Sequence, residues 1–414
     1  MLKEPFFLFG SFPGIFIKFS LFVIYFRRAF LFRKHNYNYI SVLSNLHFYQ
    51  KNFQRLMDYL RKGFPVLEQY TYLNTAASGL LPEKVWEYRQ DHDMDFFLKA
   101  SLLKDKMGEV LTTVRESVGN FFNCAPNRVA LIPNFSYGFN SILESIDKPC
   151  KVLLLENDYP SINWAVKSRN FEVVFAKLDE NLETNILARI EEEKPAFFAF
   201  SIVQYINGVK ISIGFLNKLK EKFPELILIA DGTQYFGTED FDFDGSGIDI
   251  AISSCYKWMN AGYGCGVMLF SENVQGKLHP KHLGFGSLQG KYKAHEGNFI
   301  GKFEPGHYDT LNFGSLKVAI DLLQKVGMDT IGGKINSLKE MARHRFVKAG
   351  LLEDWIAERE DYSSLFNIKG DEDLFNHLKS EGIITSLRGE GIRVSMHYYN
   401  TEKDLNQLFK ALKI

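Results

Sequence analysis

Residues 225–234 read ELILIADGTQ, an apolar run that ends at Asp231. A second short apolar run, DIAISSC (249–255), leads to Lys257 and then to the glycine-rich stretch GYGCG (262–266). Short apolar runs bounded by turn residues are typical of buried parallel strands. Ligands bind at the carboxyl ends of such strands in a doubly wound α/β sheet, so we expect both polar residues at one ligand site.

A carboxylate and a lysine at two strand ends suit pyridoxal 5′-phosphate as a cofactor. Its aldehyde forms a Schiff base with a lysine, and a carboxylate keeps its pyridine nitrogen protonated so that the ring can accept electrons. Each residue alone has an ordinary explanation, because an Asp-Gly pair is usually a turn and a lysine after a strand is usually a solvated side chain. We predict Lys257 and Asp231 as catalytic residues because further motifs accompany them.

Five segments of the chain resemble a known family. They are YTYLNTAASGLLP (70–82), ADGTQ (230–234), SSCYKW (253–258), FEPGHYDTLNFGSL (303–316) and GIRVSMHYYNTEKDLNQL (391–408). In this order they are similar to class V aminotransferase-fold proteins, which include cysteine desulfurases, kynureninases and isopenicillin N epimerase-like enzymes. The resemblance runs from about Met57 to the C-terminus. It implies the α/β architecture of fold type I pyridoxal phosphate-dependent transferases, with a large domain built on a mainly parallel sheet and a smaller α+β C-terminal domain.

The order of the predicted elements agrees with this architecture. Strand-like and helix-like patterns alternate between residues 128 and 255, which predicts a mainly parallel sheet with helices on both faces. After about Pro305, long helical patterns and short strands indicate a smaller α+β unit. The expected parts are an N-terminal extension (1–56), an N-terminal segment (57–85), a large pyridoxal phosphate-binding domain (86–305) and a small C-terminal domain (306–414).

The composition argues against some classes of function. The chain has 414 residues, 46% of them apolar, and no formal net charge. The first 56 residues hold eight basic residues and one acidic residue, which leaves 41 basic against 48 acidic residues in the rest. This mildly acidic body argues against nucleic-acid binding. The four cysteines and ten histidines show no metal-ligand spacing, so we predict no metal site, and such cysteines suit a reducing, cytoplasmic compartment.

The first 56 residues are open to three interpretations. The apolar stretch 5–32 is long enough for a membrane span, but Pro13 and Lys18 interrupt it. No small-residue cleavage site follows, which disfavours a signal peptide. The family-like sequence begins near Met57, so we favour that residue as the true start and expect a membrane partner only if residues 5–32 belong to the protein.

The resemblance puts the phosphate of the cofactor at the start of a helix. The strand RVALIP (128–133) leads into that helix, whose N-terminus would offer free N–H groups and a positive dipole end to a dianion. There Phe135 would supply a backbone amide and Ser136 a hydroxyl. Ser254 and Tyr256 would complete the phosphate site. The alternative role for Ser136 is a plain N-cap.

Three residues match positions that contact the pyridine ring in the family. Tyr159, in NDYPS (157–161), would stack on the ring face. Gln204 would contact the ring edge, and Gln234 would hydrogen-bond the cofactor's O3′. Together these residues would form the ring clamp.

An arginine in the C-terminal part is expected to bind the substrate. Arg393 matches the family's arginine that binds the substrate α-carboxylate, since a planar guanidinium offers two donors to a carboxylate. Arg388 is a second candidate. The small residues that would let the substrate approach the ring are Ala76, Ala77 and Ser78. Lys257, once free of the cofactor, would carry a proton to and from Cα, with its pKa lowered by burial.

The resemblance leaves several reactions open. We predict a class V aminotransferase that acts on a small amino acid or amine through a Schiff base on Lys257. A lyase or an epimerase of the same fold, kynureninase-like or selenocysteine lyase-like, is the alternative, because these reactions share the first carbanion. Desulfurases carry a nucleophilic cysteine on a loop before the arginine, and SLRGEGIRVS (386–395) holds none, so we do not expect a Cys-loop desulfurase. A catalytically silent scaffold is disfavoured because Lys257, Asp231 and Arg393 are all present.

The segment FEPGHYDTLNFGS resembles the family segment that crosses a twofold interface to the partner's cofactor. His307 or Thr310 would contact the phosphate there. The alternative is a domain-linking loop punctuated by Pro305 and Gly306. We predict a homodimer, a closed assembly common among soluble proteins, that binds a small amino substrate and no nucleic acid.

Overall fold

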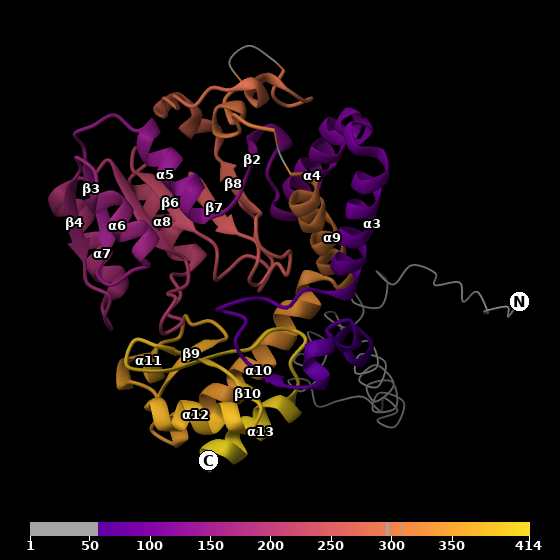
Figure 1. The fold of residues 1–414 in the computed structure, drawn as a ribbon. Helices are drawn as coiled ribbons and strands as arrows, with labels where there is room; N and C mark the ends of the chain where they lie inside the picture. Colours follow the sequence, from indigo (N-terminus) through magenta and orange to yellow (C-terminus); the bar gives the residue numbers. More distant parts are fainter. Residues whose placement is uncertain (1–56, 295–297, 308) are drawn as a thin grey trace, which may run out of the picture. The chain divides into compact units, whose positions relative to one another are not determined.

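Seven strands form the central sheet of the computed structural model, which describes residues 57–294, 298–307 and 309–414 (Figure 1). In spatial order they are β2 (Val129–Ile132), β8 (Gly266–Phe270), β7 (Ile250–Ser254), β6 (Ile227–Asp231), β5 (Phe197–Ser201), β3 (Lys151–Leu155) and β4 (Glu172–Ala176). Strand β8 runs antiparallel to both of its neighbours, and the other adjacent pairs are parallel. The predicted α/β class with a mainly parallel sheet is confirmed.

Burial explains why the strands read as continuous apolar runs. Every residue of β5, β7 and β8 is buried. Strands covered on both faces need apolar side chains at successive positions rather than alternating ones. The sheet shares a core with α5 (Phe135–Ser145) and α6 (Pro160–Lys167). Two further helices continue the alternation of strand and helix, α7 (Leu182–Glu193) and α8 (Ile213–Lys222).

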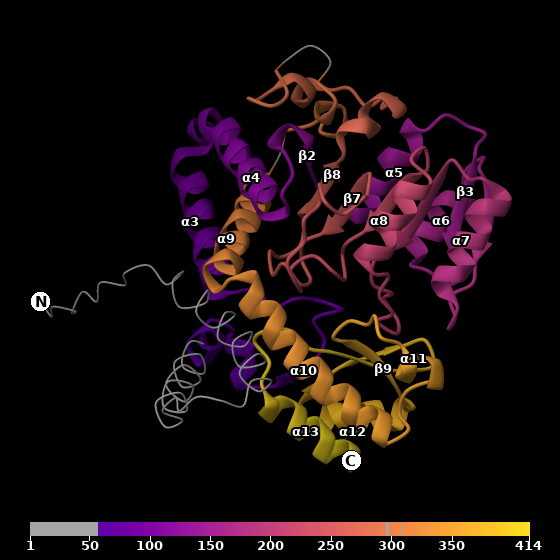
Figure 2. The ribbon, with the colours of Figure 1, turned by 180° about the vertical axis from the view of Figure 1, so that it is seen from behind.

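Three helices pack together beside the edge strand β2 (Figure 2). They are α3 (Glu83–Lys99), α4 (Met107–Phe122) and α9 (Thr310–Val326). Asp309 caps α9 by accepting hydrogen bonds from the N–H groups of Leu311 and Asn312. At the other end, Gly327 has a φ of 89°, a conformation that favours glycine, and the chain turns there into α10 (Met328–Lys348).

A second core lies in the C-terminal part. There β9 (Leu365–Lys369), β12 (Gly391–Ser395) and β11 (Ser386–Arg388) form an antiparallel sheet that packs with α10 and α13 (Glu402–Leu412). The N-terminal strand β1 (Thr71–Tyr72) pairs in parallel with β10 (Ile383–Ile384), and Leu73 enters this core. The N-terminal segment therefore packs with the C-terminal part, while the predicted domain boundaries stay a prediction. The remaining elements are α11 (Asp354–Glu358), α12 (Glu372–Ser380) and the 3-10 helices η1 (Pro65–Glu68), η2 (Ala100–Lys106), η3 (Pro126–Arg128), η4 (Glu272–Lys277), η5 (Phe285–Leu288) and η6 (Ile300–Phe303).

The interpretations of the first 56 residues lie outside the described residues. Residues 59–414 form one compact unit. Within the ranges that the structure describes, no helix has the length and apolar character to cross a membrane.

A buried ion cluster ties the segment before α9 to the sheet. Glu304 is fully buried, and its carboxylate accepts hydrogen bonds from both Nη atoms of Arg115 on α4 and from Leu131 N on β2. Lys293 Nζ lies 3.1 Å from Glu304 Oε2. Arg115 Nη1 also donates to Val129 O over 2.8 Å. Removing one member of such a cluster leaves a charge in the interior without full compensation.

Replacing Arg115 with Met is expected to lower the free energy of unfolding by about 3–5 kcal/mol, because Glu304 would lose its bidentate partner in the interior. Urea denaturation measures this change. The control is Lys84→Met, which removes an exposed ion pair with Glu87 and is expected to change the free energy of unfolding by less than about 1 kcal/mol. Equal effects of the two substitutions would contradict a stabilising role for the cluster.

Candidate active site

A cavity of about 350 Å³ lies at the carboxyl ends of β5, β6 and β7. Its volume is in the range of small-molecule sites. The lining residues are Asn134, Phe135, Ser136, Tyr159, Ser201, Val203, Tyr205, Asp231, Thr233, Gln234, Ser254, Tyr256 and Lys257. The residues among them that the sequence predicted are Phe135, Ser136, Tyr159, Asp231, Gln234, Ser254, Tyr256 and Lys257.

The strand register explains why these residues meet. Ser201 ends β5 and pairs with Asp231, which ends β6 and pairs with Ile252 of β7. Ser254 ends β7, and Lys257 follows it in the next loop. Parallel strands end at the same edge of a sheet, so polar residues that follow each apolar run gather at one place.

Asp231 is an acid held away from water. Its Oδ1 accepts a hydrogen bond from Thr233 N over 2.8 Å. Burial raises the pKa of Asp231 to about 6, against the opposing effects of the Thr233 hydrogen bonds and of the charge on Lys257. A positively charged ring nitrogen beside this carboxylate would favour its ionised form.

Lys257 is an amine whose charged form is disfavoured. The pKa of Lys257 is lowered to about 8, mainly by burial and to a smaller extent by the charges of Arg393 and Arg388, while the charge of Asp231 acts in the opposite direction. Its Nζ lies 5.9 Å from the ring centroid of Tyr159 and 5.7 Å from that of Tyr256. A lysine with this pKa is partly neutral near neutral pH, and the neutral amine is the form that attacks a carbonyl or accepts a proton.

The N-terminus of α5 borders the cavity. Asn134 caps this helix, because its Oδ1 accepts a hydrogen bond from Tyr137 N over 2.9 Å. The alternative prediction of Ser136 as the N-cap is therefore wrong, since the N-cap lies two residues earlier, at Asn134, and Ser136 Oγ instead donates to Ser161 Oγ. Phe135 N donates to Ser254 Oγ over 2.9 Å, which joins the helix start to the end of β7.

Hydrogen bonds from other parts of the chain hold the loop that carries Lys257. Trp258 Nε1 donates to Gln234 Oε1 over 2.8 Å, and Gln234 Nε2 donates to Ala76 O over 3.0 Å. One hydrogen of Gln234 Nε2 stays available for the predicted contact with O3′. Burial lowers the pKa of His397 to about 3, so its ring is neutral, and its Nε2 donates to Trp258 O over 2.8 Å.

Arg393 is a buried cation at the edge of this site. Its Nη1 donates to the backbone oxygen of Tyr205 over 2.7 Å, and its Nε has no hydrogen-bond partner in the described part of the chain. Burial lowers the pKa of Arg393 to about 10, and the charge of Arg388 adds to this effect. Since only Nη1 donates a hydrogen bond to a described residue, the guanidinium has further N–H donors that can bind an anion.

Eight predicted residues do not line the cavity: Ala76, Ala77, Ser78, Gln204, His307, Thr310, Arg388 and Arg393. Gln204 is buried between two lining residues of its loop, Val203 and Tyr205. Ala77 is partly buried beside Ala76. Thr310 begins α9, where its Oγ1 lies 2.8 Å from His92 Nε2, so a contact with a partner's phosphate stays a prediction.

The cavity also contains residues that sequence reasoning missed, among them Ser201, Thr233 and Tyr205. Asp158 was also missed; it does not line the cavity, but it hydrogen-bonds two residues that do, Ser201 and Tyr159. It is buried, and its carboxylate accepts hydrogen bonds from Ser201 N, Ser201 Oγ and Tyr159 N. It thereby fixes the turn that carries Tyr159 to the end of β5. Ser201 also ends an apolar run, which was a usable signal, but only the strand order shows that it lies beside Asp231.

Comparison with known proteins identifies the family. The model of the aminotransferase class-V family matches residues 71–408. The chain belongs to the class V aminotransferase family. The predicted resemblance is confirmed, and pyridoxal 5′-phosphate is the cofactor of this family of enzymes, so the silent scaffold is not supported.

Curated relatives of this family member carry several names. A probable cysteine desulfurase of Methanothermobacter thermautotrophicus is 24% identical over 67% of this chain and 72% of its own length. Isopenicillin N epimerase of Amycolatopsis lactamdurans is 22% identical over 83% of this chain and 94% of its own length. Because desulfurases are among the relatives, the comparisons do not favour the prediction that excludes this activity.

Solved structures share the fold of this class V protein. The cystine C–S lyase C-DES, in complex with its reaction product cysteine persulfide, has a TM-score of 0.77 at 18% identity and covers 84% of this chain and 98% of its own. A cysteine desulfurase from Thermococcus onnurineus NA1 has a TM-score of 0.75 at 16% identity, over 86% of this chain and 97% of its own. The predicted fold type I architecture is confirmed.

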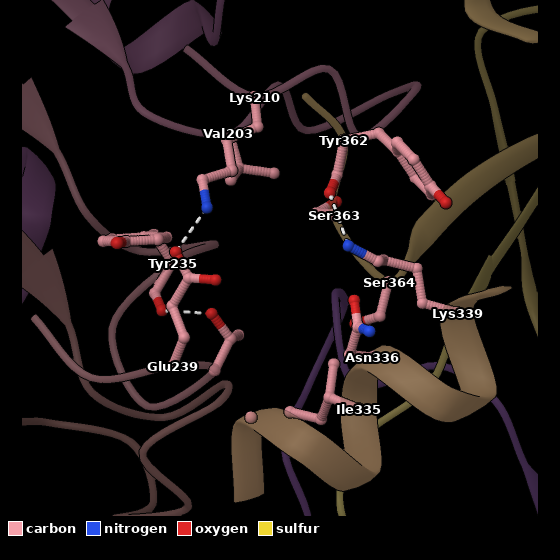
Figure 3. A pocket seen from close by; sticks show the side chains of 12 residues that line it. Val203, Lys210, Tyr235, Glu239, Ile335, Asn336, Lys339, Tyr362, Ser363 and Ser364 are labelled. Atoms are coloured by element: carbon pink, nitrogen blue, oxygen red, sulfur yellow. Dashed lines mark hydrogen bonds and ion pairs between the residues drawn. The ribbon is translucent and has the colours of Figure 1, made fainter. Parts of the chain in front are cut away.

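A second cavity of the class V enzyme is too small for a substrate (Figure 3). Its volume is about 40 Å³, which is close to the space that one water molecule takes in the liquid. Lys210, paired with Glu239, lies on one side, and Lys339 and Asn336 of α10 lie on the other. Val203 lines both cavities, so this space adjoins the site without extending it.

The attachment of the cofactor to Lys257 is expected to become faster as pH rises through about 8, because burial lowers the pKa of the amine and only its neutral form reacts with an aldehyde. Borohydride reduction followed by mass spectrometry measures the attachment at each pH. The Lys257→Ala variant should yield no modified peptide at this position. Arg393→Met should shift the profile to higher pH, since the charge of Arg393 helps to lower this pKa.

A profile centred at the ordinary lysine pKa of about 10.4 would contradict the burial of the reacting amine. A shift to lower pH in Arg393→Met would contradict the electrostatic link between Arg393 and Lys257.

Proposed function

We propose that the protein is a pyridoxal 5′-phosphate-dependent enzyme that breaks a bond at Cα of a small amino acid whose α-carboxylate binds Arg393. The observation that carries the proposal is the burial of the Arg393 guanidinium without an acidic partner among the described residues. The charge of Arg393 also adds to burial in lowering the pKa of Lys257. A buried cation of this kind requires an anion from outside the chain.

The groups around the cavity fit this cofactor. Lys257 offers an amine for its aldehyde, and Asp231 offers a buried acid for its ring nitrogen. The start of α5 and the hydroxyl of Ser254 offer polar groups for its phosphate, and Tyr159 offers an aromatic face. When bound, the cofactor would supply a ring that accepts the electron pair left at Cα.

Lys257 would act as the base that removes the proton from Cα and returns it. Its pKa of about 8 leaves part of the amine neutral near pH 7 and lets the protonated form give the proton back. Burial keeps water from competing for that proton. Asp231, fixed by Thr233 N, would hold a positive charge on the ring nitrogen throughout.

Arg393 would orient the substrate. Its Nη1 is used by Tyr205 O, which leaves Nε and Nη2 on one edge of the guanidinium. That edge offers two parallel N–H donors, the arrangement that suits a carboxylate. The backbone oxygen of Tyr205 thereby fixes the direction of the edge. An amine without a carboxylate would leave Nε buried and unpaired, so an amino acid suits the site better.

Transamination is the first candidate reaction. It needs the proton transfers at Lys257, a water molecule that breaks the C–N bond and releases the keto acid, and a second keto acid that accepts the amino group while its carboxylate binds the same edge. The name of the matching family model, aminotransferase class-V, supports it.

Elimination with cleavage of a C–S bond is the second candidate. The cystine C–S lyase with the same fold, and relatives named cysteine desulfurase, favour it. None of the four cysteines lines the cavity, and a hydrogen bond with Cys265, together with burial, raises the pKa of the Cys255 thiol well above its ordinary value. The route would therefore release sulfur to the solution and not through a thiol of this chain.

A panel of amino acids separates these reactions. Keto acid that forms only with an added keto-acid acceptor would establish transamination, and ammonia released without an acceptor would establish a lyase. Inversion at Cα without either product would establish an epimerase. The Lys257→Ala variant is expected to lose any of these activities by at least about a thousandfold, since no other amine or imidazole lines the cavity among the described residues. The control is Lys84→Ala on the surface. Absence of turnover in protein that carries the cofactor would contradict the proposal.

We also propose that the enzyme is a homodimer. Large apolar side chains are exposed along the end of α3 and in η5, where Phe97 is 81% and Phe285 is 70% exposed. Others are Phe96, Leu98, Leu102, Leu283 and Leu288. Exposed apolar side chains in such number are typical of an interface. The predicted contact of His307 or Thr310 with the partner's phosphate also requires a second copy of the chain.

Replacing Phe97 with Glu is expected to raise the dimer dissociation constant by about tenfold or more, because a charge would replace a large apolar side chain at the interface. Analytical ultracentrifugation measures it. Lys218→Glu, on the exposed side of α8, is the control and should leave it unchanged. A wild-type monomer at micromolar concentration with full cofactor occupancy and activity would contradict the dimer.

A further inference from the structure

A β-hairpin near the cavity carries two arginines on one face. Strands β11 and β12 pair in antiparallel fashion with Ser386 opposite Arg393. Arg388 lies two residues after Ser386, and residues that are opposite or two apart share a face of a sheet, so Arg388 and Arg393 are diagonal neighbours. The other face carries Leu387 and Ile392, which pack in the C-terminal core.

The arginine face of the hairpin lies toward the cavity. A Cβ on Gly389, in the turn of the hairpin, would lie 3.1 Å from Ile206 Cγ2, so the turn contacts the loop after β5. Tyr205 in that loop lines the cavity, and its backbone oxygen accepts the hydrogen bond from Arg393 Nη1. The loop therefore joins the hairpin to the wall of the site.

Arg388 has no acidic partner among the described residues. Its side chain is exposed, and its Nη1 donates only to the backbone oxygen of Leu387, over 3.1 Å. The adjacent Glu390 forms no ion pair with it in this part of the chain. Its charge nevertheless reaches the site, because it adds to burial in lowering the pKa values of Lys257 and Arg393. After one carboxylate has bound Arg393, a positive charge would remain beside it.

We propose that Arg388 binds an acidic group on the side chain of the substrate, so that the preferred substrates are amino acids with a second carboxylate. This inference rests on the proposed function, in which Arg393 binds the α-carboxylate. Two guanidinium groups on one face of a hairpin can each take one anionic end of the same molecule. A substrate with an apolar side chain would lack this interaction and leave the exposed guanidinium of Arg388 to the solvent.

Binding of unreactive acids to the cofactor-loaded protein tests this inference without turnover. Succinate carries two carboxylates and butyrate carries one, and neither has an amino group to react. By calorimetry, succinate is expected to bind about tenfold more tightly than butyrate. Arg388→Gln is expected to bring the ratio of the two dissociation constants to about one, and Arg388→Lys to retain part of the preference. Arg189→Gln, on the surface of α7, is the control and should keep the wild-type ratio.

Turnover provides a second readout. Aspartate or glutamate should have a higher kcat/KM than alanine, and this advantage should fall about tenfold in Arg388→Gln. Equal binding of succinate and butyrate by the wild type, or an unchanged ratio in Arg388→Gln, would overturn the role of Arg388 and leave that of Arg393 intact. If neither acid binds the wild type, and Arg393→Gln leaves kcat/KM for these amino acids unchanged, both this inference and the proposed function fail.

Discussion

The backbone of the loop that carries Lys257 is the constraint on which the site depends. The backbone oxygen of Tyr256 accepts a hydrogen bond from Gly79 N over 3.0 Å, and that of Trp258 accepts one from His397 Nε2. A Cβ on Gly79 would lie 1.8 Å from the backbone oxygen of Lys257, so a glycine is needed for this close approach. A loop from the middle of the sequence is thus held by segments from both ends of the described chain.

Burial then sets the chemistry of the groups that this loop brings together. It raises the pKa of Asp231 to about 6 and lowers the pKa of Lys257 to about 8, so both residues are driven toward their neutral forms. The arginines of the β11–β12 hairpin add positive charge on the substrate side. The site is therefore arranged to receive anions, which agrees with a substrate that carries at least one carboxylate and with a cofactor that carries a phosphate.

Much of the site could be predicted because its residues follow apolar runs directly. Asp231, Ser254 and Lys257 each lie at or just after a strand that the sequence makes visible. Asp158 was missed because it follows β3 but hydrogen-bonds Ser201 at the end of β5, and local patterns carry no information on which strands are neighbours. The alternative N-cap of α5 was placed two residues late, since Asn134 and Ser136 are both good capping residues and the packing of the helix decides between them.

The sequence by itself determined the α/β class, the presence of Lys257 and Asp231 at one site and the family, because short apolar runs, their polar ends and a few motifs are local features. The tertiary structure alone decided that β1 joins the C-terminal core, that Glu304 is buried against Arg115, and that Arg388 shares a face with Arg393. These relations join residues that are separated along the chain or depend on a strand register, and they arise only when the whole chain packs.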